Sequence, residues 1–204
     1  MKTHRFGSHT PEEMRRLSNL GHSVEGALLI VVSALALAAQ LNLAAWANTA
    51  WQILILVAGI LLLILIYPRH PLQDWRAIWN DLQQREHTII AFAIAIAGAA
   101  ELIRGAAIST LAFVTPVAMM LIGWLFLAHA QHGTGAAQKR ALWLHRVLGI
   151  TILLAAILRV GALVTRDEIY AILWSLVLFA AGIQLIVYRE PAGAFEEMHG
   201  AHHH

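Results

Sequence analysis

The chain has 204 residues, of which 59% are hydrophobic and only 13% are charged, and its mean hydropathy is +0.65. This composition excludes a soluble globular domain and indicates an integral membrane protein. There is no cysteine, which excludes disulfides, thiolate metal sites and cysteine nucleophiles. The basic residues form short clusters beside apolar segments rather than a continuous basic face, so nucleic acid is not an expected partner.

Residues 1–20 are expected to form a polar N-terminal segment. Within it, Thr10 has the position of a helix cap, Pro11 that of the first helical residue, and Glu13 closes a capping box. This order predicts a short helix that lies on the membrane surface. Because the first apolar run starts near Val24, after this polar stretch, the N-terminus lacks the form of a signal peptide.

Six apolar segments follow, and each is long enough to cross a bilayer as a helix. They cover approximately residues 21–41, 50–67, 87–105, 108–128, 142–164 and 168–188. Trp46 and Trp51 flank the first turn, as aromatic anchors at a membrane interface do. Pro116 predicts a kink in the fourth segment.

An amphipathic stretch, residues 71–86, separates the second and third segments. Four large apolar side chains recur in it at helical spacing, namely Leu72, Trp75, Trp79 and Leu82. This spacing predicts a helix that lies in the membrane interface, with its apolar face towards the lipid.

The elements together predict an all-α integral membrane fold. Residues 1–20 are the N-terminal segment with its surface helix, and residues 21–188 form a bundle of six transmembrane helices. Residues 189–204 form a polar tail, whose last three histidines have the form of a purification-tag remnant.

Six spans place both chain termini on one side of the membrane, here called side A; the opposite side is side B. Of the fourteen lysines and arginines, only Arg104, Arg159 and Arg166 fall towards side B. By the positive-inside rule, side A is cytoplasmic. The expected location is a bacterial-type inner membrane, crossed several times, with both termini in the cytoplasm.

All twelve histidines fall at or beyond the side A boundary. Seven belong to loops and tails, and the other five stand at the ends of spans: His22, His87, His129, His132 and His145. Four different helices are therefore expected to carry imidazoles to about the same depth. His129 and His132 share one helix face if the helix continues through both.

These five histidines are candidate metal ligands. Neutral imidazole is the commonest protein ligand for zinc, copper and iron, and helical bundles build metal sites from facing helices. Glu25, one turn further into the membrane than His22, is a candidate ligand because a carboxylate there needs a partner. With no cysteine, the expected metal is zinc, copper or non-haem iron. The alternative is that the histidines face lipid headgroups and bind no metal.

A second polar group is predicted near side B. Glu101 follows His87 by fourteen residues and Arg159 follows His145 by fourteen, so each lies about 21 Å further along its helix. Both should reach the same level, close to Arg104. We expect an ion pair that ties the third span to the fifth, with a polar gate for ions or protons as the alternative.

The order of the histidine motifs resembles the transmembrane protein 45 family of polytopic membrane proteins, across residues 21–165. The similar motifs are Gly21-His22 followed by Gly26, Glu86-His87-Thr88, Leu125-Phe126-Leu127-Ala128-His129 with a second histidine soon after, and Leu144-His145. Members of that family usually have seven spans rather than six, and their paired histidines lie closer together. The resemblance implies that the histidines act as a set, without implying a reaction.

Three functions fit these residues. The first is a metal-dependent membrane protein, either a hydrolase or oxidase acting on lipid or a metal-handling protein; in a hydrolase, Glu25 would be the general base that activates a metal-bound water. The second is a b-type cytochrome, in which two of the histidines hold haem b for transmembrane electron transfer. The third is a metal-free protein whose histidines are structural or sense pH. The sequence leaves open whether the protein is an enzyme and whether it oligomerises.

Overall fold

The computed structural model describes residues 10–66, 79, 80, 82–104, 109–128 and 135–191. The regular elements in these ranges are all helical, and six of the helices are long and apolar enough to cross a membrane. A backbone in lipid must satisfy its own hydrogen bonds, and a helix does so. The predicted all-α, six-helix membrane fold is confirmed. The elements are α1 (Pro11–Gln40), α2 (Ala45–Ile66), α4 (Leu82–Arg104), the short 3-10 helix η1 (Ser109–Phe113), α5 (Val114–Ala128), α6 (Gly135–Thr165) and α7 (Glu168–Val187).

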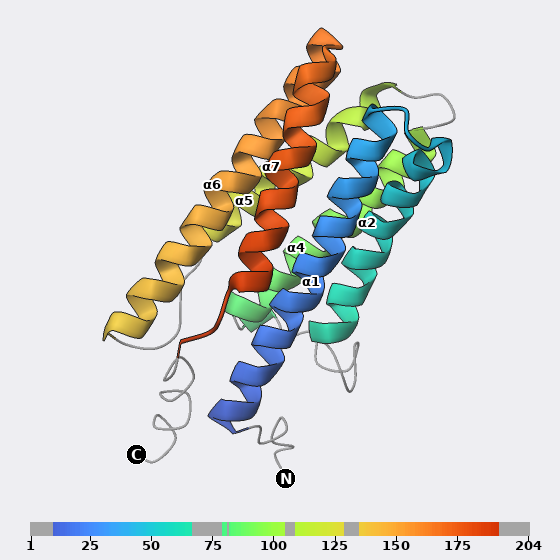
Figure 1. Cartoon of the computed structure of the whole chain (residues 1–204). Helices are drawn as coiled ribbons and strands as arrows, with labels where there is room; N and C mark the ends of the chain where they lie inside the picture. Colours follow the sequence, from blue (N-terminus) through green and yellow to red (C-terminus); the bar gives the residue numbers. More distant parts are fainter. Residues whose placement is uncertain (1–9, 67–78, 81, 105–108, 129–134, 192–204) are drawn as a thin grey trace.

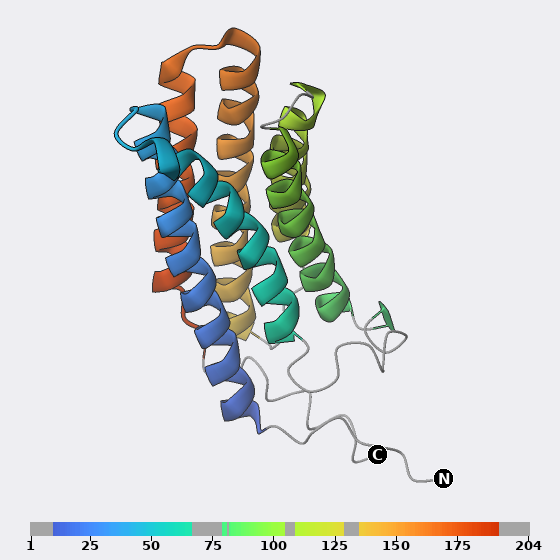
Figure 2. The same ribbon diagram turned by 90° about the vertical axis from the view of Figure 1, so that its right-hand side faces the viewer.

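The six long helices form a closed ring (Figure 1). Each helix packs against the next one in the chain, and α7 closes the ring by packing against α1. Successive helices run in opposite directions, as the side view in Figure 2 makes clear. The start of α1 and the end of α7 therefore lie together at side A, the lower end in both views.

Helix α1 is a single helix of 30 residues that includes the segment predicted to lie separately on the membrane surface. The predicted capping box is confirmed, because Thr10 Oγ1 accepts from the backbone N–H of Glu13 and the Glu13 carboxylate accepts from that of Thr10. The predicted break near residue 20 is wrong. Residues 11–20 contain no glycine or internal proline, so nothing in them ends the helix before the apolar run begins.

Two predictions about the other spans concern Pro116 and Trp51. Pro116 lies in the first turn of α5, directly after the 3-10 helix η1, so the change of helix type within this span falls beside the proline. Trp51 is only 1% exposed and points into the bundle, so it is not an interfacial anchor. Trp46, 67% exposed, does lie on the outer surface. Most of the predicted interfacial helix, residues 71–86, lies outside the described residues.

Three helix pairs cross at glycines: α1 and α7 at Gly26 and Gly182, α2 and α4 at Gly59 and Gly98, and α5 and α6 at Gly123 and Gly149. At each crossing a Cβ atom on one helix would fall within 3 Å of backbone on the other. Without a hydrophobic force between helices in lipid, such close backbone approach gives helices their packing contacts.

Replacing Gly98 with alanine is expected to destabilise the bundle by about 1–3 kcal/mol, the usual range for overpacking. Its Cβ would stand 2.3 Å from the backbone nitrogen of Leu56, which cannot move without shifting α2. Gly21→Ala is the matched control, because no atom lies within 4 Å of a Cβ there and alanine favours the helix. Detergent-induced unfolding followed by circular dichroism measures both; equal stabilities would contradict the crossing.

Candidate metal site

His22 on α1 and His145 on α6 meet inside the ring near side A. Their ring centroids are 6.1 Å apart, and the ring planes are nearly perpendicular at 80°. His145 is buried, with 5% of its surface exposed, and His22 is partly buried. The two helices are not neighbours in sequence, since α2, α4 and α5 lie between them. Two of the five histidines that stand at span ends, on different helices, therefore lie close together.

Both imidazoles are held in the same way by their own helices. His22 Nδ1 lies 2.8 Å from the carbonyl oxygen of Ser18, and His145 Nδ1 lies 2.9 Å from that of Ala141. A carbonyl oxygen only accepts, so Nδ1 must be the donor in each ring. In the neutral form the lone pair then resides on Nε2. Histidines that bind metals are commonly oriented by such a second hydrogen bond.

Two aromatic side chains complete the packing around the pair. The ring of Tyr188 lies 4.4 Å from that of His22 and 5.3 Å from that of His145, centroid to centroid. Phe126 on α5 lies 5.7 Å from His145. Four segments of the chain therefore fix the position of two imidazole rings.

Tyr188 is the first residue after α7, and the chain beyond it is tied to α1. Its hydroxyl donates to the carboxylate of Glu190, and the backbone N–H of Glu190 donates to Asn19 Oδ1 over 2.7 Å. Burial raises the pKa of both Tyr188 and Glu190 above their ordinary values. The segment that leaves α7 is therefore bonded to the same stretch of α1 that carries His22.

The raised pKa of Glu190 predicts a pH-dependent stability. A carboxyl whose pKa is raised by folding contributes stability below its unfolded pKa of about 4.3, and this is lost as pH rises through the folded value. Glu190→Gln removes the charge and keeps an acceptor for Tyr188. We expect the variant to melt at a higher temperature than the parent at pH 7.5, and the difference to shrink by pH 4. Thermal unfolding across this range tests the sign; a difference that grows towards pH 4 would contradict it.

The other predicted ligands are not in the described pair. Glu25 is one turn beyond His22 on α1, and no hydrogen bond or ion pair is found for its side chain within the described ranges. His87 lies on α4, which packs against α2 and α5 and stands two places from both α1 and α6 in the ring. His129 and His132 lie outside the described residues. In the part of the chain that the structure describes, no three His, Asp or Glu side chains lie close enough to share a metal ion.

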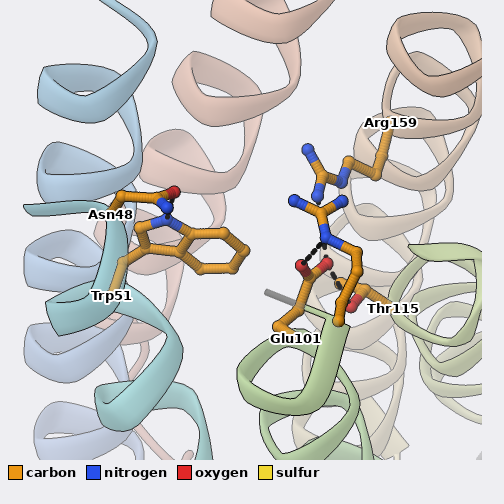
Figure 3. Close-up of polar contacts among 6 residues, drawn as sticks. Asn48, Trp51, Glu101, Thr115 and Arg159 are labelled. Atoms are coloured by element: carbon orange, nitrogen blue, oxygen red, sulfur yellow. Dashed lines mark hydrogen bonds and ion pairs between the residues drawn. The ribbon is translucent and has the colours of Figure 1, made fainter. Parts of the chain in front are cut away.

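The predicted ion pair near side B is confirmed (Figure 3). Arg159 Nη2 on α6 lies 3.0 Å from Glu101 Oε1 on α4, and Thr115 Oγ1 on α5 donates to the same oxygen over 2.7 Å. Arg104 Nε lies 3.3 Å from Glu101 Oε2. Glu101 is fully buried and Arg159 is 4% exposed, so this network links three helices through the interior.

The guanidinium of Arg159 also contacts two tryptophan side chains from other helices of the bundle. Its Cζ lies 4.8 Å from the ring centroid of Trp174 on α7 and 5.8 Å from that of Trp51 on α2. A cation facing an indole is attracted by the ring's negative face. With Glu101, Arg159 thus joins α2, α4, α6 and α7 at the centre of the bundle, which favours a structural role for this network over a gate.

Sequence reasoning missed the residues that pack against the sites from distant helices. Nothing in the local pattern connects Tyr188 with His22, or Trp51 with Arg159. One signal was present: Thr115 and Gln184 are polar side chains within apolar spans, and each makes a side-chain hydrogen bond to another helix. Polar residues in such spans usually face the bundle interior.

No protein-family model matches this chain, and a comparison with curated proteins finds no match. The resemblance to the transmembrane protein 45 family therefore rests on the short histidine motifs alone. The fold and its polar sites define a multi-pass, all-α membrane protein.

Proposed function

We propose that this membrane protein binds a transition-metal ion at side A through Nε2 of His22 and Nε2 of His145. The observation that carries the proposal is the pair of neighbouring, nearly perpendicular imidazoles, with both Nδ1 atoms donating to carbonyls of their own helices. This arrangement directs the proton of each neutral ring to Nδ1 and leaves Nε2 as the ligand atom.

The separation of the rings supports this proposal. With metal–nitrogen bonds of about 2.0–2.1 Å, two imidazoles on one ion have ring centroids about 5 Å apart at a tetrahedral angle and about 6 Å apart when opposed. The observed 6.1 Å is close to the upper value. Nitrogen ligands without thiolates suit zinc, copper or iron.

Further ligands are proposed from the sequence. Phe126 packs against His145, so the side A end of α5 adjoins the pair, and His129 follows Phe126 by three residues. His129 and His132 are the histidines proposed to complete the site. Glu25 is three residues after His22, about 4.5 Å further along the helix axis, and is proposed as a general base if the protein is a hydrolase.

A b-type haem is the second candidate. The observation that favours it is a groove of about 410 Å³ beside the two imidazoles, with apolar walls and the side chains of Arg140 and Arg189. Two oriented histidines from different helices suit axial ligation of haem iron, and the arginines suit its two carboxylates. The haem would supply one-electron transfer.

The orientation is also a proposal. Side A carries all but three of the fourteen lysines and arginines, which supports a cytoplasmic side A and an inner-membrane location by the positive-inside rule. The motif resemblance to the transmembrane protein 45 family adds support for the histidines as a set.

Elemental analysis and an absorption spectrum of purified protein test the proposal. His202, His203 and His204 are removed first, because a histidine tail binds metal by itself. We expect close to one zinc, copper or iron ion per chain and no Soret band. A Soret band with stoichiometric iron would establish the haem candidate instead. A purified protein that contains neither metal nor haem would contradict both candidate functions and leave the metal-free role.

A further inference from the structure

A groove runs along the seam between α6 and α7 at side A. It has a volume of about 410 Å³, and His22 and His145 form part of its lining. Its α6 wall extends from Arg140 to Leu148, which is about 12 Å along a helix axis. The groove therefore reaches from the membrane interface into the apolar layer.

The walls of the groove are apolar and open towards the lipid. Trp143 and Val147 lie on the α6 side, and Ile183 and Val187 on the α7 side. Trp143 is 63% exposed and Val187 is 69% exposed, so the groove has no protein cover along this seam in the described part of the chain. A chain of methylene groups could lie along such a wall and remain in contact with the bilayer.

The mouth of the groove carries two positive charges. Arg140, in the second turn of α6, and Arg189, just after α7, both line it and both are exposed. Arg189 Nη1 donates to the carbonyl oxygens of Ile186 and Tyr188, each over 2.6 Å, which fixes its guanidinium at the helix end. No acidic side chain lines the groove in the described ranges. The carboxylate of Glu190, the residue after Arg189, accepts a hydrogen bond from the Tyr188 hydroxyl.

We propose that this groove binds an anionic phospholipid from the side A leaflet. The phosphate is held by Arg140 and Arg189, and one acyl chain lies along the apolar wall. Arginine suits phosphate because its planar fork donates two parallel hydrogen bonds. Basic pockets between transmembrane helices bind anionic lipid headgroups. A free phosphate ion would make no favourable contact with the apolar wall, whereas the acyl chain of a lipid would. This lipid site does not depend on the metal at His22 and His145.

Native mass spectrometry of the full chain, delipidated in neutral detergent, tests the lipid site. Phosphatidylglycerol is titrated against phosphatidylcholine with the same acyl chains, and against inorganic phosphate. We expect the parent protein to prefer phosphatidylglycerol, and an Arg140→Gln/Arg189→Gln variant to bind it about 25-fold more weakly, at roughly fivefold for each arginine. Equal binding of the two lipids would overturn the proposal, as would competition by inorganic phosphate alone.

A matched control separates a site from general surface charge. Arg16→Gln/Arg146→Gln removes two exposed arginines from the same side, and neither lines the groove. We expect this control to keep its affinity; a loss equal to that of the groove variant would overturn the proposal. Val147→Trp fills the groove, keeps both arginines and should also weaken binding, which keeps the test valid if the double variant folds poorly.

The haem alternative has its own readout. If purified protein has a Soret band and the Arg140→Gln/Arg189→Gln variant loses haem, the groove binds haem carboxylates and the lipid proposal is overturned. The Arg140→Gln/Arg189→Gln variant also separates the lipid site from the metal site, because it keeps both His22 and His145 and should lose the preference for phosphatidylglycerol while it retains a bound metal ion.

Discussion

Replacing Glu101 with alanine is expected to destabilise the protein by about 3–5 kcal/mol, the cost of leaving one charge of a buried pair without its partner. Arg159 is 4% exposed, and its guanidinium would remain in the apolar interior against two indoles. Thr115 would lose its acceptor as well. Detergent-induced unfolding at neutral pH measures the change.

Two control variants test whether the loss of stability comes from the buried ion pair. Glu12 pairs with Arg16 on the outside of α1, where both side chains are more than half exposed, so Glu12→Ala should cost less than about 1 kcal/mol. A Glu101→Leu/Arg159→Met variant removes both buried charges and should recover most of the lost stability, because apolar replacement of a buried pair is often neutral. If Glu101→Ala lowered the stability no more than Glu12→Ala does, the buried network would not be what stabilises the packing of α4 with α6.

Replacing either His22 or His145 with alanine is expected to lower metal affinity by more than about 100-fold. Changing a group that merely orients a ligand costs 10- to 100-fold, and removing the ligand itself should cost more. Metal content after dialysis against a weak chelator gives the comparison. A His9→Ala/His70→Ala variant, which removes two histidines from outside the pair, should retain the metal.

One further variant distinguishes ligation from packing. His145→Phe keeps a flat ring against Phe126 and Tyr188 but supplies no nitrogen lone pair. We expect it to lose the metal while the metal-free protein unfolds as the parent does. Retention of metal in His145→Phe would remove this residue from the site.

The depth of polar groups in the bundle could be predicted from the sequence. Glu101 and Arg159 stand fourteen residues beyond His87 and His145, and two helices of equal rise brought them together. The same reasoning placed His22 level with His145. Depth along a helix depends only on residue count, which the sequence contains.

Position around the ring could not be predicted in that way. His87 was expected beside His22 and His145, but the three do not form a group that could hold a metal ion in the described part of the chain. Trp51 is an aromatic residue near a helix end, as an interfacial anchor would be. It is instead buried against Arg159, a residue over a hundred positions later in the chain. Such contacts depend on the packing of helices that are distant in the sequence, so a local sequence pattern cannot predict them.

Helix ends were predicted least well, for a related reason. The fifth span was predicted to start at about residue 142, yet α6 begins at Gly135 and carries Lys139 and Arg140 in helical turns ahead of the apolar run. Hydropathy marks where the lipid begins, whereas the helix continues for as long as its backbone bonds are met. Arg140, which lines the groove at side A, lies in this extension.

The central claim is that His22 and His145 bind one metal ion, and X-ray absorption at the metal edge tests it most directly. The sample is the purified protein without His202, His203 and His204. We predict nitrogen ligands at about 2.0–2.1 Å with the outer-shell pattern of at least two imidazoles, and no bound metal to give an edge in His145→Phe. A spectrum without coordinated imidazole, or one unchanged in a His22→Ala/His145→Phe variant, would contradict the claim.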